Sequence, residues 1–70
     1  MQILSSSAAT VTVELTNVEV LAICNALNEV RSGPGALTVG DMHPRLGATA
    51  EEVAATHHAM REALHTMEPF

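Results

Sequence analysis

The 70-residue chain contains no tryptophan and no tyrosine, and its single phenylalanine is Phe70. Its interior must therefore be built from aliphatic side chains and methionine. Cys24 is the single cysteine, which excludes an internal disulfide. A chain of this length buries only roughly 60% of the surface that its unfolded form exposes. Because neither a disulfide nor aromatic bulk is available, we expect the fold to gain stability by covering apolar surface with a second copy.

Lysine is also absent, and the only basic residues besides histidine are Arg31, Arg45 and Arg61. Eight carboxylates give a net charge of −5. Nucleic acids and anionic membranes require clustered cations, so this composition argues against direct binding to either. An acidic surface fits a basic partner or the mimicry of a polyanion, and it also simply keeps a small protein soluble. Neither a leader segment nor a long apolar run is present, so we expect a cytoplasmic location.

The first third of the chain predicts one strand and one helix. Residues 10–15 alternate between polar and apolar types, which indicates a strand with Val11, Val13 and Leu15 facing a core. Residues 1–8 include three consecutive serines and are expected to be a flexible segment, although residues 2–4 are a further candidate for pairing with the strand.

A capping box at Thr16 and Glu19 predicts a helix over 17–31. Its wide apolar face is expected to pack on the strand and on the last helix, and Cys24 falls outside that face. The residues of the face are Val20, Ile23, Ala26, Leu27 and Val30.

The remainder predicts two further helical elements. Residues 36–39 are a candidate second strand, and Asp41 is expected to open a short helical turn over 41–46 that Gly47 closes. A second capping box begins at Thr49 and predicts a helix over 50–67. The sequence therefore predicts one small α+β domain of the order β-α-α. The open edges of its strand favour a sheet shared within a two-fold homodimer.

The helix expected over 17–31 is apolar nearly all round, which indicates that more than one of its sides is covered. Isolated exposed apolar residues are ordinary, which is the alternative explanation. As contacts with a partner we predict residues from this helix and from the strand, namely Val18, Leu21, Asn25, Val11 and Val13.

Four histidines raise the question of a metal site. His58, Glu62 and His65 share one helical face and could offer ligands to zinc or nickel, but no cysteine or aspartate on another element supports them by spacing. The alternative is a solvated face with a helical His–Glu pair. His57 lies within an apolar stripe and is expected to be buried and hydrogen-bonded.

No pattern indicates catalysis. Cys24 lies mid-helix among apolar residues and is interpreted as a small apolar side chain. Glu51 and Glu52 lie in the first turn of the last predicted helix, where the helix dipole stabilises carboxylates. We therefore expect no enzyme activity, no cofactor and no small-molecule substrate.

The segment Arg45-Leu46-Gly47-Ala48-Thr49 resembles the turn of a helix-turn-helix DNA reader. The helix that follows such a turn enters the major groove, and here it would bring the carboxylates of Glu51 and Glu52 against phosphates. We therefore interpret the segment as a structural corner between two helices.

Asn25-Ala26-Leu27-Asn28-Glu29-Val30, followed by residues 45–53, resembles a set of short bacterial proteins for which no activity is established. The resemblance covers residues 14–65, and it carries the pattern NALNEV … RLGxTxEEV. Those proteins typically have an acidic-aromatic pair before the turn, where this chain has Asp41-Met42. The resemblance supports the expected fold. A structural explanation of its polar residues is that Asn28 and Glu29 cap or tie the following loop and that Arg45 pairs with Glu29.

Three functions remain open from the sequence. The first is a small non-enzymatic protein-interaction module, homodimeric and of inhibitor or immunity type. The second is an acidic nucleic-acid-mimic decoy of phage or mobile-element origin. The third is a metal-responsive regulator. The decoy requires one continuous acidic face formed by Glu14, Glu19, Glu51, Glu52 and Glu62.

Overall fold

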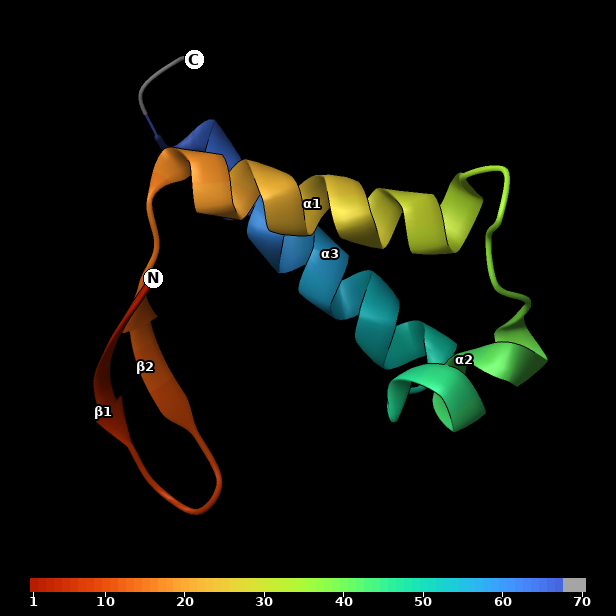
Figure 1. Ribbon diagram of the computed structural model, residues 1–70, viewed down its shortest axis with the longest axis horizontal. Helices are drawn as coiled ribbons and strands as arrows, with labels where there is room; N and C mark the ends of the chain where they lie inside the picture. Colours follow the sequence, from red (N-terminus) through yellow and green to blue (C-terminus); the bar gives the residue numbers. More distant parts are fainter. Residues whose placement is uncertain (68–70) are drawn as a thin grey trace.

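The computed structural model describes residues 1–67, and over these it is a mixed α+β fold with a two-stranded antiparallel sheet and three helices. The strands β1 and β2 form a hairpin, and the helices α1, α2 and α3 follow along the chain (Figure 1). The bounds are β1 Gln2–Ser6, β2 Val11–Glu14, α1 Asn17–Ser32, α2 Val39–Leu46 and α3 Ala50–His65.

The serine-rich start of the chain forms the strand β1, so the prediction that residues 1–8 are flexible is wrong, and the candidate pairing of residues 2–4 with the second strand is confirmed. Ile3 pairs with Val13, and the register shifts at Leu4, where β1 has a bulge. The turn is closed at Ser7, whose N–H donates to the Thr10 carbonyl at 2.8 Å and whose hydroxyl accepts the Thr10 N–H at 3.0 Å. The serines therefore supply the turn chemistry that holds the two strands together.

Residues 36–39, the candidate for a second strand, do not form one. The Ala36 N–H donates to the Gly33 carbonyl and the Leu37 N–H to the Val30 carbonyl, so this segment folds back on the end of α1. Helix α2 then begins at Val39 with Thr38 as its N-cap, so the cap expected at Asp41 is wrong. Asp41 lies in the first turn and accepts a hydrogen bond from the Thr38 hydroxyl at 3.0 Å.

Both predicted capping boxes are present. At the start of α1, the Thr16 N–H donates to Glu19 Oε1 at 2.9 Å and the Glu19 N–H donates to Thr16 Oγ1 at 3.2 Å. Thr49 and Glu52 repeat these bonds at the start of α3. Helix α3 ends at His65, two residues before the expected end.

Gly47 forms the corner between α2 and α3. Its φ of 76° is left-handed, and its N–H donates to the His43 carbonyl at 2.9 Å. A left-handed residue at this position is the usual end of a helix and favours glycine. The corner brings α2 against α3.

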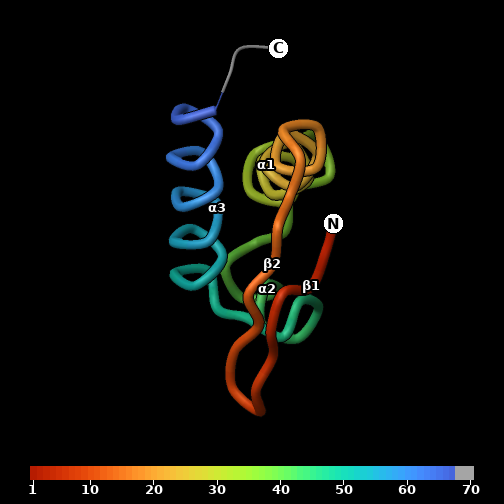
Figure 2. The backbone as a smooth tube through the Cα atoms, turned by 90° about the vertical axis from the view of Figure 1, so that its left-hand side faces the viewer, coloured from red at the N-terminus to blue at the C-terminus, as the bar shows by residue number. Residues whose placement is uncertain are grey.

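The core lies where α3 meets α1 and α2 (Figure 2). Cys24, which was expected outside the main apolar face of α1, is buried, whereas Ala26 is exposed. The reason is that, among the described helices and strands, α1 packs only on α3, so its buried stripe runs through Val20 and Cys24, which lie one turn apart. The buried residues are Val20, Cys24, Met42, Val53 and His57.

Neither strand of the hairpin packs on a helix (Figures 1 and 2). The expectation that the strand faces a core is therefore wrong: Val11 is 56% exposed, and Val13 and Leu15 are half-buried. The molecule is flat, with extents of 33 × 33 × 15 Å, because the hairpin extends the chain sideways instead of adding a layer.

Candidate functional site

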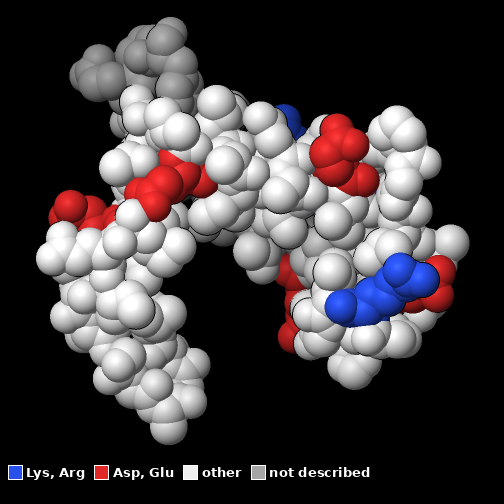
Figure 3. Space-filling view, in the orientation of Figure 1, with Lys and Arg blue, Asp and Glu red and all other residues white. Residues whose placement is uncertain are grey.

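The hairpin of residues 2–14, which we call the hairpin arm, carries an apolar face without a partner. The bulge at Leu4 shifts the side-chain alternation, so Ile3 lies on the same face as its partner Val13 and as Val11. Ile3 is 65% exposed, and Leu4 at the bulge is 55% exposed. Figure 3 shows the arm projecting away from the helices. This apolar face is therefore free to contact another molecule.

The edge of β1 is also open. Within the described residues β1 pairs only with β2, so each strand has one outer edge with unpaired backbone groups. Natural edge strands commonly carry charges or proline that block further pairing. β1 has neither, since it reads Gln-Ile-Leu-Ser-Ser, whereas β2 carries Glu14. An isolated two-stranded hairpin is only marginally stable in water, so a further strand would stabilise the arm.

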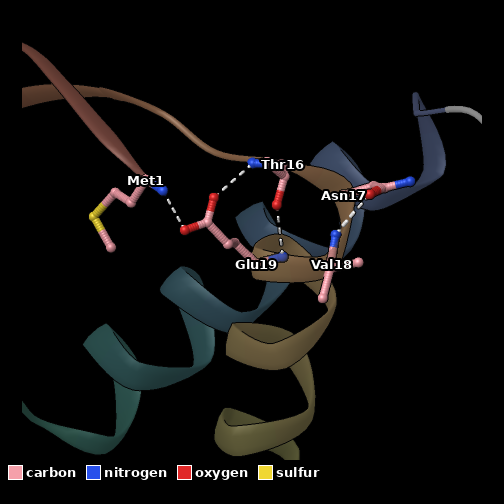
Figure 4. Close-up of polar contacts among 5 residues, drawn as sticks. All are labelled: Met1, Thr16, Asn17, Val18 and Glu19. Carbon is pink, nitrogen blue, oxygen red and sulfur yellow. Dashed lines mark hydrogen bonds and ion pairs between the residues drawn. The ribbon is translucent and has the colours of Figure 1, made fainter.

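One ion pair joins Met1, the residue that precedes the arm, to helix α1 (Figure 4). The amino group of Met1 bonds to the carboxylate of Glu19, whose other oxygen caps the Thr16 N–H. Through the hydrogen bond from the Met1 amino group, and next the backbone bond from Thr16, the pKa of Glu19 falls to about 2. Over residues 1–67 no other hydrogen bond or ion pair crosses from the segment before Glu14 to a helix.

The predicted contact residues do not form one surface. Val11 and Val13 lie on the arm, and Val18 is 64% exposed in the first turn of α1. Leu21 is half-buried, and Asn25 lines a depression between α1 and α3. Sequence reasoning missed Ile3 and Leu4, because a two-residue apolar pair beside three serines has no strand periodicity.

That depression, the α1–α3 groove, has a volume of about 320 Å³. His57 in its wall is 5% exposed, and its Nδ1 lies 2.8 Å from Nη1 of Arg31. A guanidinium only donates, so Nδ1 accepts and the proton of the neutral ring is on Nε2. Burial, and next the charges of Arg31 and Arg61, lower the pKa of His57. The expectation that His57 is buried and hydrogen-bonded is confirmed. The lining residues are Cys24, Asn25, Asn28, His57, Arg61, Leu64 and His65.

A second depression of about 360 Å³ lies between the end of α1 and α2, and both Glu29 and Arg45 line it. The ion pair expected between them is absent from the described residues. Glu29 instead lies against Gly33, where a Cβ atom would collide with its carboxylate. The bond from the Ser32 hydroxyl to the Asn28 backbone carbonyl, at 3.1 Å, lies within α1, and the helix is capped by the Gly33 N–H, which donates to the Glu29 carbonyl at 3.0 Å.

The histidines on the exposed face of α3 do not form a metal site. His58 Nε2 lies 3.9 Å from Glu62 Oε1, and both side chains are exposed. Among residues 1–67, no three side chains of His, Cys, Asp or Glu come together to hold a metal ion. The carboxylates lie in separate patches in Figure 3, and those of Glu19 and Glu52 are occupied in capping boxes.

No helix within residues 1–67 combines the length and the apolar character that crossing a membrane requires. In comparisons with known proteins, no family model, no curated protein and no solved structure matches the chain.

Proposed function

We propose that the protein is a small non-enzymatic interaction module that works as a homodimer joined through its hairpin arm. The observation that carries this proposal is the separation of the arm, whose apolar face and outer edges pack on no helix within residues 1–67. A second copy is the occupant we assign to it, because the exposed edge of β1 is complementary to itself when two strands run antiparallel.

In the proposed dimer, β1 of each copy pairs with β1 of the other, which gives one four-stranded antiparallel sheet with the two β2 strands outermost. This order places no ionisable side chain in the central pair of strands, since Gln2–Ser6 contains none. Glu14 of the two copies stays at the outer borders, which matters for a chain with a net charge of −5. Pairing satisfies the backbone groups of β1 and brings Ile3 and Leu4 of both copies into one seam.

The test is the molecular mass in solution, measured by sedimentation equilibrium. We expect a dimer at tens of micromolar. Leu4→Lys puts two ammonium groups into the seam and is expected to yield a monomer, because charged edge residues block strand pairing.

Val39→Lys is the matched control, because Val39 is 77% exposed on α2 and lies outside the arm. It makes the same charge change and is expected to leave the dimer intact. Far-UV circular dichroism of both variants is expected to keep the helical signal, since no helix packs on the arm. A wild-type protein that remains strictly monomeric at this concentration overturns the proposal.

A further inference from the structure

The α1–α3 groove has a charge opposite to that of the chain as a whole. Only three arginines stand against eight carboxylates. Yet Arg61 lines the groove, and Arg31 holds the ring of His57 in its wall. Neither arginine forms an ion pair within residues 1–67, and no carboxylate lines the groove. Arg61 therefore places one positive charge in the groove, and Arg31 places a second beside Nδ1 of His57, without a carboxylate among the described lining residues.

The neutral groups of the groove are hydrogen-bond donors as well. Because Nδ1 of His57 accepts from Arg31, Nε2 carries the proton. Every fully buried side-chain nitrogen and oxygen among the described residues has a hydrogen-bond partner. Nε2 of His57 has none, so this atom is accessible to solvent. The Ser32 hydroxyl, which bonds to the Asn28 backbone carbonyl at 3.1 Å, also lies 3.3 Å from Asn28 Oδ1, so the amide N–H groups of Asn28 point away from Ser32 and can donate. Asn25 adds a second exposed amide.

From this juxtaposition we propose that the α1–α3 groove binds a small oxyanion, a phosphate or carboxylate group, through Arg61, His57 and the amides of Asn25 and Asn28. Guanidinium and N–H donors arranged around a concave surface are the groups that recognise such oxygens. Arg31 acts as a positioning residue, because its bond to Nδ1 fixes which nitrogen of His57 donates. The site goes beyond the proposed dimer, since none of its residues belongs to the hairpin arm.

The experiment is a pair of titrations of the full chain, one with inorganic phosphate and one with sodium acetate. Both are followed by nuclear magnetic resonance shifts of the side chains of His57 and Arg61, in Tris buffer with ionic strength held constant by sodium chloride. We expect saturable shifts confined to the groove. If phosphate binds more tightly, the ligand class is phosphoryl, and if acetate does, the class is carboxylate; either result supports the site.

Arg61→Gln is the test variant, and Arg45→Gln is the matched control, because it makes the same charge change at the second depression. Arg61 is exposed, so its replacement is expected to leave the fold intact. We expect Arg61→Gln to weaken binding about tenfold or more, as loss of a charge-assisted hydrogen bond does, and Arg45→Gln to change it less than about twofold.

Two results would overturn the proposal. One is the absence of saturable shifts with either anion, and the other is an equal effect of the two arginine variants, which would indicate binding by net charge alone. The Leu4→Lys variant is expected to bind the anion as the wild type does, because Leu4 is not in the groove. Failure of the dimer and failure of the oxyanion site are therefore distinguishable.

Discussion

Replacing Ile3 by alanine measures how much the seam of the proposed dimer depends on apolar contact. The change removes three carbon atoms, which contribute about 2.4 kcal/mol when fully buried, at about 0.8 kcal/mol per methylene. Ile3 is 65% exposed in the single chain, so roughly two thirds of that free energy remains to be gained on association. We take a neighbouring strand to cover about half of the exposed surface of a side chain on a sheet face. Burial of Ile3 in the seam therefore contributes about 0.8 kcal/mol per copy to dimer formation.

Two copies of Ile3 enter the two-fold seam, so Ile3→Ala is expected to weaken the dimer by about 1.6 kcal/mol, which is a rise of roughly fifteenfold in its dissociation constant. Sedimentation equilibrium over a range of protein concentrations gives that constant directly. Val39→Ala, on an exposed apolar residue of α2, is the control and is expected to leave it unchanged. Equal dissociation constants for wild type and Ile3→Ala would refute the assignment of the arm to the interface.

Three further predictions concern stability, each measured by urea unfolding followed by circular dichroism. The pKa of His57 lies below its ordinary value of 6.5, so the folded chain binds fewer protons than the unfolded chain at low pH. The free energy of unfolding is therefore expected to fall as the pH drops below about 6.5, and His57→Gln is expected to flatten this pH dependence. Thr49→Ala removes a cap and is expected to cost about 1 kcal/mol, and Thr38→Ala less, because Thr38 makes no side-chain bond to its helix backbone. Gly47→Ala places a Cβ at a φ of 76° and is expected to cost about 1 kcal/mol; an unchanged midpoint would contradict this.

The parts of the fold that the sequence predicts well are those set by local chemistry. The capping boxes at Thr16 and Thr49 depend on residues three positions apart, and the corner at Gly47 depends on one residue that tolerates a left-handed φ. The candidate pairing of residues 2–4 is confirmed, but the extension of β1 to Ser6 was missed, because it is decided across the turn at Ser7 and the bulge at Leu4 breaks the alternation that would indicate a strand. The periodicity of residues within β1 therefore predicts neither its pairing with β2 nor the bulge.

The candidate sites were predicted only in part. His57 was identified because a histidine within an apolar stripe must find a partner, but its partner Arg31 is 26 residues away and no spacing rule connects them. The convergence of Arg61 on the same groove arises from the crossing of α1 and α3, a tertiary feature. Val11 and Val13 were predicted to contact a partner. The strand register pairs Ile3 with Val13, so Ile3 joins them as a candidate contact residue.

The separation of the arm from the helices has a consequence for how this chain tolerates change. Residues that share no neighbours alter the free energy of unfolding additively, so a substitution in residues 2–14 leaves the effect of one in α3 unaltered. The residues of the two strands can therefore change, by evolution or by design, while the packing of α1 on α3 and the groove between them keep their shape. If both proposals hold, a hairpin transferred from one such chain to the helices of another would change the dimerisation partner and leave the proposed oxyanion site unchanged.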